Sequence, residues 1–387
     1  MGENRGSRVV DRGSNDPGRP HSWRAAPSSP ESGATVDKVR GGIAEPRITN
    51  HEPRLLSVEG LTIGFGANGH FIPAVIDVTF NVSAGETLCV VGESGSGKSL
   101  TALSIMRLVP SPGRIANGRI FFKSRDLLTL SEREMQRVRG ADIALIFQEP
   151  ATALNPVFTV GSQIADTLVV HGRATRRRAR QKAIELLDAV SVPEPQQRVD
   201  DYPHQLSGGL RQRALIAMSL ACSPALLIAD EPTTALDVTI QAQILELLRT
   251  LQQRLGLALL LITHDLGIVA EMADRVAVMY AGRIVEQAHV RTLFSDPKHP
   301  YTRGLMGSLP GGARGSRLTA IPGTVPSPGA LPPGCSFMPR CPDRFEPCPA
   351  AHPADTVFPD ARTVKCYLHG PAAEPPEVSR GSRTSIT

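Results

Sequence analysis

The stretch Gly92–Ser99, GESGSGKS, carries the residue types that hold a triphosphate. It matches the pattern G-x-x-x-x-G-K-[ST], in which glycines let backbone N–H groups curl around phosphate oxygens. In this pattern Lys98 reaches the β- and γ-phosphates, and the Ser99 hydroxyl binds Mg²⁺. The stretch therefore predicts a nucleoside-triphosphate site formed by Gly92, Glu93, Ser94, Gly95, Ser96, Gly97, Lys98 and Ser99.

Two adjacent acids, Asp230 and Glu231, end the apolar run at residues 225–230. Carboxylates at the end of a buried strand are costly unless a cation or a water molecule needs them. Asp230 suits the coordination shell of Mg²⁺, and Glu231 suits a general base that polarises an attacking water. With the phosphate loop, the two acids predict hydrolysis of the nucleotide.

Strands that alternate with helices must position these groups. The apolar runs at residues 87–91, 225–230 and 257–263 predict buried strands, and the phosphate loop lies between the first of them and a segment with helical spacing. Residues 131–190 are more polar and predict an inserted helical subdomain. This order predicts an α/β fold with a largely parallel sheet. One amphipathic helix face is predicted from Ile240, Ile244, Leu247, Leu251 and Leu255.

Length and composition narrow the class of protein. The 387 residues are enough for two domains, and 41% hydrophobic with 20% charged residues is typical of a globular protein. Neither an apolar run of about 18 residues nor the apolar core of a signal peptide is found, which predicts a chain that stays in the cytoplasm. The net charge of +5 permits contact with nucleic acid, but few aromatic residues are available to stack on bases, so no nucleic-acid partner is predicted.

A third motif, QLSGGLRQR, places Ser207, Gly208 and Gly209 at the start of a predicted helix. Such a helix end is a second anion-binding site. At this motif the chain resembles the ATP-binding subunits of ABC transporters, in which L-S-G-G is the family signature. The resemblance implies a head-to-tail dimer that encloses two ATP molecules, with each signature touching the γ-phosphate held by the other subunit.

The resemblance also assigns roles to single residues. Gln148 in IFQEP matches the Q-loop, which adds a ligand for Mg²⁺ beside Ser99 and Asp230. Asp237 matches the D-loop, and His264 matches the switch histidine that senses the γ-phosphate. Phe65 occupies the place of the aromatic residue that stacks on adenine. The implied catalytic residues are Glu231, His264 and Gln148.

Longer stretches narrow the resemblance. YPHQLSGGLRQR, HPYTRGLM, IPGTVPSP and the cysteine stretch at residues 334–349 are similar to ATPase subunits of dipeptide and oligopeptide importers. This implies a peripheral protein on the cytoplasmic face of the cell membrane, whose ATP hydrolysis energises peptide uptake. The implied partners are a second homologous ATPase, two permease subunits and an extracytoplasmic substrate-binding protein.

Other functions remain open on the sequence. Similar importers carry nickel or other small solutes. An ABC ATPase of DNA repair would insert a coiled coil or zinc modules before the signature, and no sustained heptads are present here. An iron–sulfur ABC protein of translation would carry two nucleotide-binding domains in one chain, whereas each motif occurs once.

Four cysteines follow the spacing C-x5-C-x6-C-x17-C: Cys335, Cys341, Cys348 and Cys366. Structural disulfides are disfavoured in the cytosol, and four thiolates can hold zinc or an iron–sulfur cluster. The spacing does not distinguish the two, but the resemblance to peptide-importer ATPases implies a [4Fe–4S] cluster. Cys89 and Cys222 lie in apolar contexts and are predicted to be core thiols.

The predicted domain organisation has four parts. Residues 1–53 and 370–387 have compositions typical of a disordered extension and a disordered tail. Residues 54–295 are predicted to form the P-loop ABC ATPase core with its helical subdomain. Residues 296–369 are predicted to form a small loop-rich cysteine domain with a core of its own.

Overall fold

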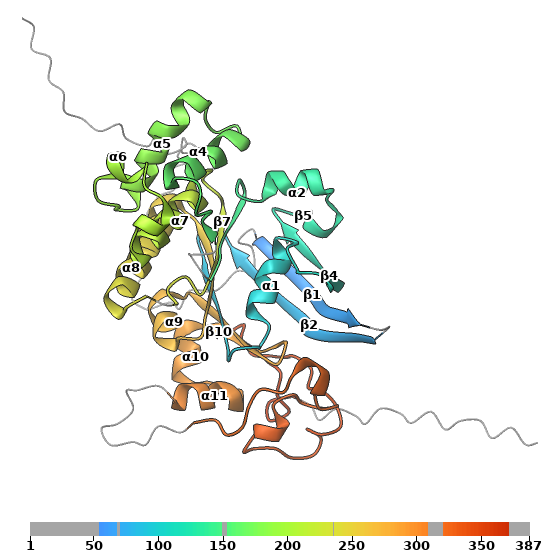
Figure 1. The fold of residues 1–387 in the computed structure, drawn as a ribbon. Helices are drawn as coiled ribbons and strands as arrows, with labels where there is room; N and C mark the ends of the chain where they lie inside the picture. Colours follow the sequence, from blue (N-terminus) through green and yellow to red (C-terminus); the bar gives the residue numbers. More distant parts are fainter. Residues whose placement is uncertain (1–53, 68–69, 149–152, 235, 309–319, 371–387) are drawn as a thin grey trace, which may run out of the picture. The chain divides into compact units, whose positions relative to one another are not determined.

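A large sheet in the order β11-β12-β10-β9-β3-β8-β7-β6 is the centre of the fold (Figure 1). The structure is a computed structural model that describes residues 54–67, 70–148, 153–234, 236–308 and 320–370. The predicted N-terminal extension, 1–53, and the tail from residue 371 lie outside the described residues. Five neighbouring strands of the sheet are parallel: β9 (Arg275–Tyr280), β3 (Thr87–Val91), β8 (Ala258–Thr263), β7 (Leu226–Asp230) and β6 (Ile143–Ile146).

The other edge of this sheet is antiparallel and includes the C-terminal segment. Glu286 and Gln287 pair with Val364 and Thr363, so a strand from beyond residue 320 joins the large sheet directly. The three strands of this edge are β10 (Arg283–His289), β12 (Thr363–Val364) and β11 (Thr356–Val357).

A separate antiparallel sheet has the order β2-β1-β4-β5. Its members are β1 (Arg54–Ala67), β2 (His70–Ser83), β4 (Gly113–Phe122) and β5 (Arg125–Asp126).

Helices follow the strands and form the predicted helical subdomain (green in Figure 1). Its range differs from the expected 131–190, because β6 lies inside that range and belongs to the large sheet. None of the helices in the described ranges has the length and apolar character needed to cross a membrane. The subdomain contains α4 (Val160–Val170), α5 (Arg176–Ala189), α6 (Pro195–Arg198) and α7 (Gly208–Leu220).

The remaining helices are distributed along the chain. The 3-10 turns are η1 (Leu127–Thr129), η2 (Pro203–Gln205), η3 (Pro328–Ala330) and η4 (Met338–Arg340). The α-helices are α1 (Lys98–Ile105), α2 (Glu132–Val138), α8 (Val238–Leu255), α9 (Leu266–Met272), α10 (Val290–Ser295) and α11 (Pro300–Gly307).

The two faces of the large sheet bury separate sets of apolar residues. In β3, Cys89 and Val91 face one core, while Leu88 and Val90 face the other. This alternation is the normal consequence of a strand's two-residue period. Cys89 and Cys222 are buried thiols, as predicted.

The C-terminal segment shares the first of these cores. Tyr301 and Phe337 are buried in the same cluster as Val276, Val278 and Tyr280 of β9. The expectation that residues 296–369 have a core of their own is therefore wrong. The segment is poor in aliphatic residues, and it buries Tyr301 and Phe337 against the large sheet instead.

Candidate functional site

The phosphate loop connects β3 to α1 and runs close against β9. A Cβ atom at Gly92 would lie 2.1 Å from the carbonyl oxygen of Met279, so no larger residue fits there. Gly97 caps α1 with φ 100°, a conformation that glycine adopts without strain. The loop backbone is also held by the Gly282 N–H, which donates to the carbonyl oxygen of Ser96 (2.9 Å).

Lys98 lies inside this loop and is nearly buried. Its Nζ donates to the carbonyl oxygens of Gly92 (2.8 Å) and Glu93 (3.0 Å). Burial lowers the pKa of Lys98, while the carboxylates of Glu231, Asp230 and Glu93 act in the opposite direction. A buried cation with only neutral hydrogen-bond acceptors gains a stronger partner when an anionic phosphate arrives.

Asp230 and Ser99 form the second part of the site. The Ser99 hydroxyl, in α1, donates to Oδ1 of Asp230, at the end of β7, at 3.0 Å. Burial raises the pKa of Asp230, Ser99 lowers it, and the neighbouring Glu231 raises it further. A carboxylate and a hydroxyl placed in this way are the oxygen ligands that Mg²⁺ prefers, and a divalent cation would offset the burial of the charge.

Glu231 is held by side chains from three places in the chain. Its Oε2 accepts from Gln148 Nε2 (3.0 Å) and from the Thr234 hydroxyl (2.9 Å), and His264 Nδ1 lies 3.1 Å from its Oε1. The Glu231 side chain is 11% exposed, whereas that of His264 is 58% exposed. The contact of Thr234 with Glu231 was not predicted, and the signal for it is the position of Thr234, three residues after Glu231 in a turn.

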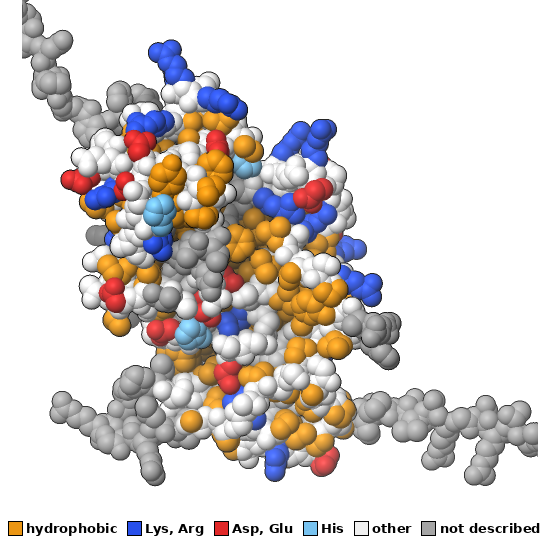
Figure 2. Space-filling model, in the orientation of Figure 1, with side chains coloured by type: hydrophobic (Ala, Val, Ile, Leu, Met, Phe, Trp, Pro, Cys, Tyr) orange, Lys and Arg blue, Asp and Glu red, His pale blue; other side chains and the backbone are white. Residues whose placement is uncertain are grey.

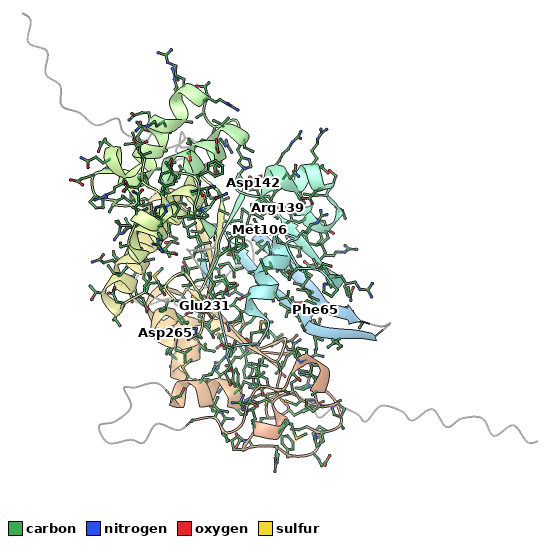
Figure 3. All side chains as sticks on the ribbon, in the orientation of Figure 1. Phe65, Met106, Arg139, Asp142, Glu231 and Asp265 are labelled. Carbon is green, nitrogen blue, oxygen red and sulfur yellow. The ribbon has the colours of Figure 1, made fainter. Side chains whose placement is uncertain are left out.

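The backbone at Glu231 has the left-handed φ of 46°, and its N–H donates to the carbonyl oxygen of Ile262. Such strain is common at functional sites. Burial raises the pKa of Glu231, but hydrogen bonds from His264 and Thr234, with the charges of His264 and Lys98, lower it overall. The carboxylate is therefore ionised at neutral pH and free to accept a proton. Figure 3 labels Glu231, and Figure 2 shows acidic, basic and histidine side chains at the surface in this region.

The signature and the D-loop lie elsewhere in the chain. Ser207 caps α7 by accepting from the Leu210 N–H, and Asp237 caps α8 by accepting from the Ile240 N–H. Gly208 and Gly209 form the first turn of α7. Within the described ranges, no hydrogen bond connects these residues to the phosphate loop. The starts of α7 and α8 lie close together, because a Cβ atom at Gly209 would lie 2.8 Å from the Ile240 side chain.

Phe65 also lies apart from Glu231, on the antiparallel sheet (Figure 3). Its ring packs over Gly113 of β4, where a Cβ atom would lie 2.7 Å from the ring. No described contact joins Phe65 to the phosphate loop.

The four C-terminal cysteines come together around one cavity. The Cys335 N–H donates to the Cys348 carbonyl oxygen (2.9 Å), and a Cβ at Gly334 would lie 2.1 Å from that oxygen. Glycine at 334 thus allows the two segments to run this close. The side chains that line the cavity include His299, Cys335, Phe337, Cys341, Cys348, Cys366 and Tyr367.

All six cysteines of the chain are free thiols. Burial is the main factor that raises the pKa of Cys341 and of Cys366, each to about 11, and the other cysteines of the cavity raise both further. Burial and the neighbouring thiols therefore both favour the protonated form of Cys341 and Cys366. Among the described residues, however, no set of three or more His, Cys, Asp or Glu side chains has the geometry of a metal site.

Two family models match this chain. The ABC transporter model matches residues 75–234, and the model of the oligopeptide/dipeptide transporter C-terminal region matches residues 285–348. The dipeptide transport ATP-binding protein DppD of Bacillus subtilis is 50% identical over 323 residues, 83% of this chain and 96% of that relative. The chain belongs to the ATP-binding proteins of ABC transporters.

Further relatives and solved structures that match this chain belong to the same family. The oligopeptide transport ATP-binding protein AppD of Bacillus subtilis is 51% identical over 81% of this ABC ATPase and 97% of its own length. A dimeric post-hydrolysis structure of the ATP-binding cassette MJ0796 with ADP and Pi has a TM-score of 0.55 and 27% identity, covering 61% of this chain and 99% of that one. The structure of cbiO1 from Clostridium perfringens, part of the ABC transporter complex cbiONQ, also has a TM-score of 0.55 and 27% identity. The match covers 63% of this chain and 92% of that one.

The matched regions bear on the predicted fold. The α/β cassette fold and the ABC ATPase family are confirmed. The C-terminal model begins within β10, ahead of the expected boundary at residue 296, and it includes Cys335, Cys341 and Cys348 but not Cys366. The boundary between the regions therefore falls inside a strand of the large sheet of this ABC ATPase.

Proposed function

We propose that this ABC ATPase is the subunit that binds and hydrolyses ATP in an importer of dipeptides or oligopeptides. The observation that carries the proposal is the hydrogen-bonded group around Glu231, directly after Asp230 and beside the phosphate loop. The names of the relatives, dipeptide and oligopeptide transport ATP-binding proteins, support the peptide as substrate. An importer of nickel or another small solute would use the same ATP site.

Each residue of the site has a role in this proposal. The backbone N–H groups of the loop and Lys98 bind the phosphates, and Ser99, Asp230 and Gln148 would hold Mg²⁺, which neutralises charge on the phosphates. Glu231 accepts a proton from the attacking water. Gln148 and Thr234 orient the Glu231 carboxylate. The more exposed His264 contacts the γ-phosphate.

A second ATPase subunit completes the site. Ser207 and Gly208 are exposed at the start of α7, a 13-residue helix whose N-terminal N–H groups can bind an anion. In the proposed dimer this helix end, with Gly209 and Asp237, faces the ATP held by the partner, and Phe65 stacks on adenine. The similar MJ0796 cassette is dimeric in its post-hydrolysis state, which supports this arrangement.

Permease subunits are the proposed partners at the segment between β6 and α4, which leads into the helical subdomain. Phe147, Val157 and Phe158 have exposed fractions of 44%, 70% and 53%, which is unusual for such large apolar side chains so near one another in sequence. Figure 2 shows hydrophobic side chains on this part of the surface. Docking there would place the protein on the cytoplasmic face of the membrane, with an extracytoplasmic substrate-binding protein delivering peptide to the permeases.

A reconstitution tests the importer. We expect weak ATP hydrolysis from the isolated chain, because its site lacks a partner's signature. The rate should rise when the permeases, a second ATPase and a peptide-loaded binding protein are assembled in lipid. A binding protein loaded with Ni²⁺ in place of peptide is the comparison for the alternative solute. Stimulation by DNA and not by this assembly would contradict the proposal.

For the cysteine cavity we favour a [4Fe–4S] cluster held by Cys335, Cys341, Cys348 and Cys366, with zinc as the alternative. Four thiols line one cavity, and thiolate is the ligand type that both zinc and iron–sulfur clusters take. The centre would tie together a loop-rich segment and so contribute to its folding free energy.

Cysteine substitution tests this centre. Protein purified without oxygen should be brown and contain about four irons per chain. Replacing any of the four cavity cysteines by Ser should remove the colour and the iron. Cys222→Ser is the matched control, because Cys222 is a buried free thiol outside the cavity. A colourless preparation with stoichiometric zinc would favour a zinc site and contradict the iron–sulfur cluster. A preparation without any metal would contradict both the cluster and the zinc site.

A further inference from the structure

We propose that Arg340, helped by Tyr301, is a positioning residue for the phosphate loop, so that the C-terminal segment sets the affinity for nucleotide. Arg340 Nη1 is 2.9 Å from Glu93 Oε1, and the two residues are 247 positions apart in the chain. Glu93 is the second residue of the loop. The Arg340 side chain is 6% exposed, so this ion pair is shielded on the side of the arginine.

The guanidinium is held rigidly by its other contacts. Its Nε donates to the carbonyl oxygen of Pro322 at 2.8 Å, and its carbon lies 5.7 Å from the centre of the Tyr280 ring. Tyr280 itself packs on Tyr301 and Phe337, with ring centres 4.6 and 5.2 Å away. A planar cation fixed in this way loses little side-chain entropy when it binds a carboxylate.

Tyr301 holds the same loop residue by its backbone. The Glu93 N–H donates to the Tyr301 hydroxyl at 3.0 Å, and Tyr301 is fully buried. The carbonyl oxygen of Glu93 accepts from Lys98. Glu93 is therefore fixed at its side chain and its N–H by the C-terminal half of the chain, and at its carbonyl by the phosphate-binding lysine.

Two physical effects connect this arrangement with ATP. A loop that presents its N–H groups to phosphate binds more tightly when its shape is fixed in advance. In addition, Arg340 neutralises the Glu93 carboxylate, which would otherwise repel an anionic phosphate close to Lys98. Loss of the guanidinium removes both effects at once.

The same short turn connects the arginine with the cysteine cavity. Arg340 ends η4, which lies between Cys335 and Cys341. The Met338 N–H donates to the Cys335 carbonyl oxygen (3.0 Å), and the Cys341 N–H donates to that of Met338 (3.3 Å). The backbone that carries Arg340 is therefore hydrogen-bonded, within one turn, to the backbone of two cysteines that line the cavity. The inference itself depends only on ATP binding and not on which solute is transported or which metal is held.

Titration of the full-length chain with ATP and ADP tests the inference. We expect Arg340→Gln to weaken the binding of both nucleotides about 3- to 30-fold, with the rate at saturating ATP changed less than the affinity. Arg303→Gln is the matched control. Arg303 also lies in the C-terminal half and pairs with Asp343 at 3.0 Å, but that ion pair is exposed and does not reach the loop. The Arg303→Gln variant should bind both nucleotides with the affinity of the parent protein.

A double-mutant cycle separates positioning from a general loss of structure. In the Glu93→Gln background no carboxylate remains to be neutralised, so Arg340→Gln should change the affinity by less than about twofold. Glu93→Gln also tests the contact from the loop side if the arginine variant does not fold. Parent-like affinity in Arg340→Gln would overturn the inference. Additive effects of Glu93→Gln and Arg340→Gln on the nucleotide affinity would also overturn it. Equal losses of affinity in Arg340→Gln and Arg303→Gln would do the same.

Discussion

Glu231→Gln should slow ATP hydrolysis by about 10²–10⁴-fold while ATP binding persists, because the change keeps the shape of the side chain and removes the proton acceptor. The lowered pKa of Glu231 means that the parent carboxylate is already ionised at neutral pH. Thr234 and Gln148 can still donate to the remaining carbonyl oxygen of the amide. The measurement is phosphate release in a single turnover, with nucleotide affinity determined in parallel.

Glu246→Gln is the control for this experiment. Glu246 lies in α8, where it pairs with Arg249 at the surface, and it has no contact with the nucleotide site. Its hydrolysis rate should match that of the parent protein. If Glu231→Gln also hydrolyses at the parent rate in the assembled transporter, another group is the base.

Lys98→Ala should act before hydrolysis, by weakening ATP binding about 10- to 150-fold. The ammonium group is 2.8 and 3.0 Å from two loop carbonyl oxygens, so it already lies where the phosphates are expected. Calorimetric titration of the isolated chain measures the change. The two substitutions thus have opposite signatures, since one lowers the rate and the other the affinity.

Lys182→Ala is a suitable comparison, because Lys182 is a half-buried residue of α5 that donates to the carbonyl oxygen of Arg173. Its affinity for ATP should be that of the parent. Unchanged affinity in Lys98→Ala would remove Lys98 from the phosphate site.

The parts of the site that are local in sequence could be predicted. The strand, glycine loop and helix around Lys98 are one continuous stretch, and Asp230 with Glu231 follows directly from a buried strand. The partners of Glu231 were harder to derive from spacing alone. Gln148 is 83 residues away and His264 is 33 residues away, and both reach it only because β6, β7 and β8 are neighbours.

Packing of the helices and of the C-terminal segment could not be derived from local patterns. In α8 the predicted face included Leu255, which is 49% exposed beside the C-terminal cap, whereas Leu245 and Leu248 are buried. The prediction of a separate C-terminal core was wrong, because Phe337 packs in the same core as residues of β9 in the large sheet. Contacts such as that of Arg340 with Glu93 depend on this packing, and composition carries no sign of it.

The pairing of β12 with β10 has a consequence for how the protein avoids self-association. Without residues 356–364, β10 would be a seven-residue strand with free N–H and C=O groups along one side. Such an edge is a template for pairing with another chain. β11 and β12 are only two residues long each, so the edge they leave in its place is too short to recruit a foreign strand. The C-terminal segment thus ends the sheet and protects the ATPase core from edge-to-edge aggregation.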